Sequence, residues 1–301
     1  MRAWSARLFT TAEGRIRLGW RLALFIVVAA FVALGAGYFL PPSTGLVGGA
    51  AVLLIGAVVA GWILLALDGR SPGALGFRLS REAPLESGFG LLLGIGLGLA
   101  VVALMALVGV VRWAPEPGGV VAWLSGALGA LAFLALPAAA EEALLRGYPL
   151  QALAEAWGGV WAVVLTASVF GLLHLPNPGA GLLTTVNVVA AGLLLGAVYL
   201  RTSSLWWASG VHLGWNWAHG YAADVPVSGL EVVNAPGYEG VLSGPPWLGG
   251  GVFGPEGSIL STIVLLAATA ACWWGPWLRP GPAAMASDPL YPIPNFEEVS
   301  A

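Results

Sequence analysis

Eight long apolar segments most constrain the fold of this chain of 301 residues. A helix needs about 20 apolar residues to cross a bilayer, where its backbone must satisfy its own hydrogen bonds. Only 9% of the residues are charged, against about 25% in a soluble domain. The sequence therefore predicts an all-α, polytopic transmembrane bundle of about eight spans. The spans cover approximately residues 21–40, 46–67, 88–111, 121–141, 159–175, 181–200, 203–220 and 258–277.

The placement of arginine predicts the orientation of this bundle. All 12 basic residues are Arg, and with eight spans only Arg112 falls in a loop on the second side. Loops rich in Arg stay cytoplasmic, so both termini are expected in the cytoplasm of a cell whose inner membrane holds the protein. The arginines on the cytoplasmic side are Arg2, Arg7, Arg15, Arg17, Arg21, Arg70, Arg78, Arg81, Arg201 and Arg279.

The chain divides into a membrane domain with polar ends. An Arg-rich cytoplasmic leader over 1–20 precedes a transmembrane domain over 21–277, and a Pro-rich, flexible cytoplasmic tail covers 278–301. A long loop over 221–257, rich in Gly and Pro and acidic, is expected outside. The absence of a basic patch argues against a nucleic-acid partner, while the small net charge of −3 does not bear on it. The single cysteine, Cys272, lies in an apolar stretch and is interpreted as packing.

Two adjacent carboxylates, Glu141 and Glu142, directly follow the apolar fourth segment. Ionisable groups at bilayer depth are costly, so a retained pair indicates a functional site. Glu142 and Arg146 are four residues apart and can pair along one helix, which leaves Glu141 about 100° round the axis to face a cavity. The alternative is that the pair ends the span at the cytoplasmic interface, with Arg146 as a snorkelling anchor.

Histidines add polar groups to two further predicted helices. The three histidines, His174, His212 and His219, all lie within the fifth to seventh segments. Phe170 shares a helix face with His174, and Asn216 shares one with His212, because each pair is four residues apart. These faces predict a polar active-site cavity between helices 4, 5 and 7. His219 lies two turns beyond His212 and is interpreted as a helix-end or entrance residue.

Residues of these types suit the activation of water. A poorly solvated carboxylate can take a proton from water, His can orient the water or protonate a leaving amine, and Asn can stabilise an oxyanion. Glu141, His174 and His212 also match a common zinc ligand set, so hydrolysis with no cofactor and hydrolysis with a divalent metal such as zinc both remain open. His-Glu-x-x-His and Gly-x-Ser-x-Gly are both absent.

Three motifs, in order, resemble the CPBP family, which comprises the type II CAAX prenyl proteases and related bacteriocin-processing, Abi-like proteins. The family's Glu-Glu-x-x-x-Arg, Phe-x-x-x-His and His-x-x-x-Asn motifs are matched within about residues 120–220. The resemblance implies a multi-helix intramembrane endopeptidase that acts on a membrane-anchored peptide or protein. The residues that carry it are Glu141, Glu142, Arg146, Phe170, His174, His212 and Asn216.

The resemblance also implies a role for each motif residue. Glu141 would activate water with help from His174, while His212 and Asn216 would stabilise the oxyanion. Two other functions are a catalytically silent immunity or scaffold protein and a proton-coupled transporter, although the repeat symmetry typical of transporters is missing. The Arg-only, Gly- and Ala-rich composition indicates a bacterial protein. Supporting roles fall to Glu142, Arg146 and Phe170.

A shared site requires these residues to lie at the same depth in the membrane. Counting spans puts Glu141 near the cytoplasmic face and His174 near the opposite one, too far apart to share a water. We therefore expect the fourth helix to run past Arg146, to about Trp157, and to be tilted or to begin outside the bilayer. Trp215, which lies between the residues of the third motif, is interpreted as packing, with a place in a substrate groove as the alternative.

Overall fold

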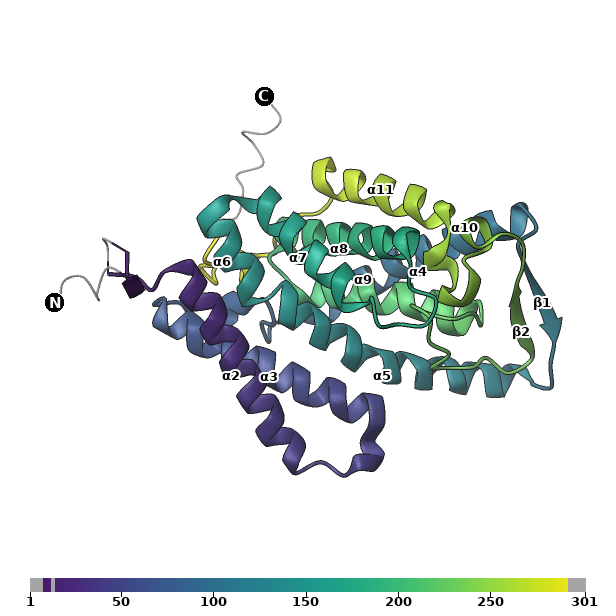
Figure 1. Ribbon diagram of the computed structural model, residues 1–301, viewed down its shortest axis with the longest axis horizontal. Helices are drawn as coiled ribbons and strands as arrows, with labels where there is room; N and C mark the ends of the chain where they lie inside the picture. Colours follow the sequence, from purple (N-terminus) through teal and green to yellow (C-terminus); the bar gives the residue numbers. More distant parts are fainter. Residues whose placement is uncertain (1–7, 12–13, 292–301) are drawn as a thin grey trace.

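A computed structural model describes residues 8–11 and 14–291, and these form a mostly helical bundle (Figure 1). Each predicted span contains a helix. The helices are α2 (Leu18–Tyr38), α3 (Gly45–Leu67), α4 (Ala83–Leu107), α5 (Val120–Leu145), α7 (Gly159–Leu173), α8 (Leu182–Thr202), α9 (Leu205–Trp217) and α11 (Ile259–Trp274). Short helical elements lie between or after them: η1 (Pro42–Thr44), η2 (Pro72–Leu75), α6 (Tyr148–Trp157), η3 (Ala218–Ala222), α10 (Pro246–Gly249), η4 (Gly251–Phe253), η5 (Pro255–Gly257) and, after α11, α12 (Pro282–Met285).

Five helical segments in the described part of the chain are long and apolar enough to cross a membrane. They are α2, α3, α4, α8, and α5 taken together with α6. The helices α7 and α11 are apolar but shorter, and α9 has only 13 residues. The apolar helices indicate an integral membrane protein, while the count of eight spans and the cytoplasmic position of the termini stay predictions.

A small two-stranded sheet lies at one end of the bundle (Figure 1). Strand β1 (Val111–Pro115) follows α4 and pairs antiparallel with β2 (Tyr238–Leu242), which belongs to the long loop over 221–257. The indole of Trp113 on β1 also donates a hydrogen bond to the carbonyl of Ala223, at 3.0 Å. The predicted all-α bundle does not include this sheet, because the pairing joins two loops that are far apart in the sequence.

The fourth predicted helix does continue beyond Arg146, with a break. After α5, the backbone amides of Arg146 and Gly147 both donate to the carbonyl of Glu142, and α6 then runs to Trp157. A Cβ atom at Gly147 would lie 2.5 Å from the carbonyl oxygen of Ala143, so glycine permits the tight turn. The two helices together span residues 120–157, which places Glu141 far from either end of the segment.

Glycines bring α4 and α9 into backbone contact. A Cβ atom at Gly94 would lie 2.1 Å from the carbonyl oxygen of Val211, and one at Gly214 would lie 2.2 Å from that of Leu91. Small residues allow membrane helices to approach closely in this way. The contact fixes the position of α9, the helix that carries His212.

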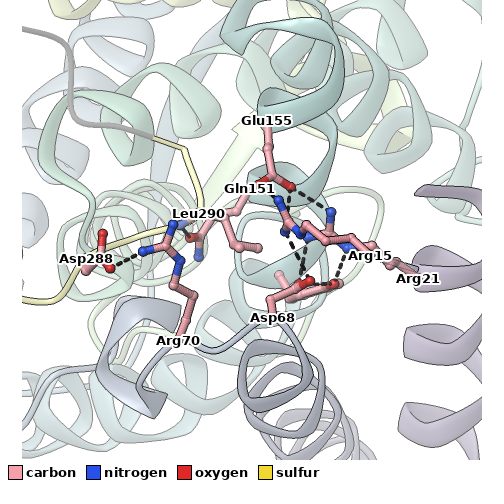
Figure 2. Close-up of polar contacts among 9 residues, drawn as sticks. Arg15, Arg21, Asp68, Arg70, Gln151, Glu155, Asp288 and Leu290 are labelled. Atoms are coloured by element: carbon pink, nitrogen blue, oxygen red, sulfur yellow. Dashed lines mark hydrogen bonds and ion pairs between the residues drawn. The ribbon is translucent and has the colours of Figure 1, made fainter. Parts of the chain in front are cut away.

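Charged side chains tie three elements together at the other end of the bundle (Figure 2). Arg21 of α2 is buried and forms ion pairs with Asp68, at 2.7 Å, and with Glu155 of α6, at 2.6 Å. Arg15 contacts the same two carboxylates, and the hydroxyl of Tyr148 donates to Asp68 at 2.8 Å. Arg15 of the predicted leader and Arg21 at the start of the predicted membrane domain thus hold α2 against α3 and α6, while Arg2 and Arg7 lie outside the described residues.

The last described residues return to this same end. Asp288 forms an ion pair with Arg70, and the backbone amide of Leu290 donates to Gln151 at 3.1 Å (Figure 2). Leu290 is buried in the apolar cluster around α6. Of the segment predicted as a flexible tail, residues 278–291 therefore pack on the bundle, and 292–301 lie outside the described residues.

Candidate active site

Glu142 is the centre of a buried polar chain that joins the first and third motifs. Its Oε1 accepts hydrogen bonds from Arg146, at 3.1 Å, and from Nδ1 of His212, at 3.0 Å. Both Glu142 and Arg146 are completely buried. An ionised carboxylate only accepts hydrogen bonds, so Nδ1 of His212 carries the hydrogen and Nε2 is left for other partners.

Arg146 makes further contacts that hold three helices together. Its guanidinium donates to the carbonyl of Gly192 on α8 at 3.2 Å. The same group lies over the ring of Phe170 on α7, with 4.6 Å between the guanidinium carbon and the ring centre. A guanidinium offers a planar fork of donors and a face for stacking, and this site uses both. Arg146 therefore connects α5 with α7 and α8.

Glu141 faces a different environment from its neighbour. Its side chain is 34% exposed, whereas that of Glu142 is fully buried. Its Oε2 lies 3.8 Å from Nε2 of His212 and has no hydrogen-bond partner among the described residues. The rotation of about 100° between successive residues of a helix produces this division, with one carboxylate in an ion pair and the other at a cavity.

His174 lies directly after α7, at its C-cap. Its Nδ1 is 2.8 Å from the carbonyl oxygen of Phe170, which can only accept, so Nδ1 carries the hydrogen. Nε2 is then the nitrogen available for chemistry. The ring of Phe170 contacts those of His174 and His212, with centres 4.6 Å and 5.8 Å apart. Phe170 is thus the packing partner of both histidines.

The four predicted catalytic residues line one cavity of about 380 Å³. Glu141, His174, His212 and Asn216 enter it from α5, the end of α7 and α9. The remaining walls are largely apolar and include leucines of α3, α5 and α7, and residues 227–232 of the long loop also contribute. The cavity can therefore hold a water beside polar groups while apolar surface surrounds the rest of a bound segment.

The structure places one more carboxylate, from the long loop over 221–257, against the helix of the third motif. Glu256 is buried, and its Oε1 accepts from the indole of Trp215 at 2.8 Å. Its Oε2 accepts from the amide and the hydroxyl of Ser228, each at 2.6 Å. The sequence offers one signal for this contact, because a buried indole N–H needs an acceptor.

His219 is placed away from the cavity. It is fully buried in the π-helical turn η3, directly after α9, and its ring packs edge-on against Trp215 with centres 4.6 Å apart. The residues that line the cavity do not include it. This agrees with a helix-end position, and it leaves the role of His219 a prediction.

A metal ion finds no ready set of ligands in this arrangement. Among residues 8–11 and 14–291, no three His, Cys, Asp or Glu side chains converge as ligands for one ion. The candidate set of Glu141, His174 and His212 therefore does not fit a bound zinc as the side chains stand.

Comparison with known proteins identifies the central part of the chain. Residues 122–218 match the family model described as type II CAAX prenyl endopeptidase Rce1-like. The matched stretch contains all three motifs and every predicted catalytic residue. No curated protein and no solved structure gives a significant match.

Proposed function

We propose that this chain, whose residues 122–218 match the Rce1-like type II CAAX prenyl endopeptidase family, is an intramembrane protease with a specific mechanism. The chain cleaves peptide bonds of membrane-associated proteins, with Glu141 as the base that activates water. One observation carries this proposal: Glu141, His174, His212 and Asn216 line the same cavity.

Hydrolysis begins with a water held beside Glu141 and His174. Glu141 takes a proton as the water oxygen bonds to the substrate carbonyl carbon, and the carbonyl oxygen becomes an oxyanion. The amide of Asn216 and the Nε2–H of His212 donate to that oxyanion. Collapse of the intermediate breaks the C–N bond, and the proton on Glu141 passes to the leaving amine.

Glu142 serves this mechanism through His212. Because Nδ1–H of His212 is donated to Glu142, the ring is held with Nε2 turned towards Glu141 and the cavity. His212 then donates from Nε2 as the imidazolium, whose charge the two flanking carboxylates balance. An acidic residue that orients a catalytic imidazole is a common arrangement in hydrolases.

The decisive experiment compares wild type with Glu141→Gln in proteoliposomes. Membrane-anchored peptides with and without prenyl groups are incubated with each protein, and products are identified by mass spectrometry. We expect cleavage by wild type, its loss in Glu141→Gln, and no change in Glu239→Gln, which removes an exposed carboxylate of β2. Two folded but inert proteins across the library would favour the silent scaffold. A chelator arm tests metal dependence.

A further inference from the structure

Glu256 reaches the site from outside the family-matched residues. It lies in η5 (Pro255–Gly257), just before α11, and is only 7% exposed. Its carboxylate joins Trp215 of α9 to Ser228 of the long loop. Trp215 lies between His212 and Asn216 in the sequence. Its hydrogen bond therefore joins Glu256 to the helix that carries both residues.

A small side chamber separates Glu256 from the proposed catalytic groups. The chamber has a volume of about 30 Å³, and its polar lining comprises His174, His212, Asn216, Ser228 and Glu256. Apart from Glu256, all these polar residues also line the main cavity, so the two spaces adjoin. A buried water needs about 15 Å³ and two to four polar partners. The chamber therefore has room for one or two waters and the groups to bind them.

Hydrogen-bond capacity is left over on both sides of this chamber. A carboxylate has about four acceptor sites, and Trp215 and Ser228 supply three donors to Glu256. On the other side, Nδ1 of His174 is used by the carbonyl of Phe170, which leaves Nε2. A bridging water can donate to both of these remaining acceptors at once.

We propose that Glu256 is a positioning residue of the active site, acting on His174 through water in the side chamber. The bridging water fills the one acceptor site of Nε2 and holds the imidazole of His174 in place, and its own oxygen accepts a hydrogen bond from the attacking water beside Glu141. This inference rests on the proposed function. Its competitor is a purely structural Glu256, which would tie the long loop to α9 with no effect on the catalytic histidine.

Two variants separate these roles. Glu256→Gln keeps the shape of the side chain, but its amide nitrogen cannot accept from the donors it meets. Ala191→Val leaves every bond of Glu256 in place and fills the chamber, because Ala191 lines the chamber and not the main cavity. Glu239→Gln, in the same loop but exposed, is the matched control.

The first measurement needs no substrate. The chain has only 3 His, so ¹⁵N-histidine labelling gives three imidazoles to follow by NMR at one pH. We expect Glu256→Gln and Ala191→Val to move the Nε2 signal of His174, and Glu239→Gln to leave it unchanged. If neither of the first two variants moves that signal, the proposal is overturned. Should Glu256→Gln fail to fold, Ala191→Val alone decides.

The second measurement uses cleavage. We expect Glu256→Gln to lower kcat about ten- to hundredfold with KM unchanged, the range found for outer partners that orient metal-binding histidines. Ala191→Val should lower kcat in the same way. The double variant should lower kcat by a smaller factor than the product of the two single factors, because both changes act on one interaction. A kcat equal to wild type in both single variants contradicts the proposal. If wild type itself cleaves nothing, the proposed function fails. The NMR measurement still tests whether Glu256 acts on His174, because it needs no substrate.

Discussion

Oε1 of Glu142 lies 3.0 Å from Nδ1 of His212, on a residue 70 positions further along the chain. This contact joins the first family motif to the third inside the bundle. The sequence predicts only a local partner for Glu142, namely Arg146, which the structure also shows at 3.1 Å. One buried oxygen therefore serves the helix pair and the imidazole together, and the two glutamates should respond differently to mutation.

Glu141→Gln should abolish cleavage and leave stability near that of wild type, since Glu141 faces the cavity and pairs with no Arg of the described residues. Glu142→Ala should lower both cleavage and stability, because it leaves Arg146 buried without its carboxylate partner. Breaking a buried ion pair in this way lowers the free energy of unfolding by about 3–5 kcal/mol. Unfolding in detergent, followed by circular dichroism, measures stability beside the cleavage assay. Equal unfolding curves for the two variants would contradict the division of roles.

Arg146→Lys should destabilise the protein although it keeps the charge. A lysine ammonium cannot reach Glu142 and the carbonyl of Gly192 together while also stacking on Phe170. We expect the free energy of unfolding to fall by about 1–3 kcal/mol, the usual cost of leaving a buried polar group unsatisfied. Arg279→Lys, at an exposed position, is the control, and a similar change in both variants would argue against the three-way contact.

Local patterns predicted most of the helices, while the role of the cavity-lining residues as an active site stays a prediction. Apolar runs located the helices, and the four-residue spacing of Glu142 and Arg146 predicted their ion pair, because both depend on neighbours along one helix. The extension of the fourth helix to Trp157 followed from the requirement that Glu141 and His174 share a depth. The break at Gly147 was not predicted, since it depends on a close backbone approach.

Contacts between distant segments could not be predicted in the same way. Glu256 looked like one of several acids in a polar loop, because its partners Trp215 and Ser228 meet it only after the loop folds back on α9. The pairing of β1 with β2 has the same origin. The packing of Leu290 beside α6 likewise arises from contacts that a Pro-rich segment does not reveal by its composition.

Gly94→Ala should impair both folding and cleavage. Its new Cβ atom would meet the carbonyl oxygen of Val211 at 2.1 Å, which forces α9 and its His212 away from α4. Overpacking of this kind costs about 1–3 kcal/mol. Gly96→Ala on the same helix is the matched control, because its Cβ would meet no atom within 4 Å. Comparable melting temperatures and cleavage rates in the two variants would rule out a close α4–α9 contact.

Asp224→Asn should stabilise the long loop at neutral pH. Burial raises the pKa of the Asp224 carboxyl, although the hydrogen bond from the amide of Ala235 opposes that shift. Because the folded-state value is raised, the contribution of Asp224 to stability is fully present below its unfolded pKa and is lost as pH rises through its folded pKa. Asparagine stays neutral, can still accept from Ala235, and tolerates the φ of 53° at this position.

Hydrogen exchange measured by mass spectrometry tests this expectation on peptides that cover residues 224–240. In wild type, protection of these amides should fall as pH rises through the titration of Asp224, once the intrinsic pH dependence of exchange is removed. In Asp224→Asn the corrected protection should be flat and, at neutral pH, higher than in wild type. Glu231→Gln, an exposed acid of the same loop, should retain the wild-type slope. A wild-type slope in Asp224→Asn would assign the pH dependence to another group.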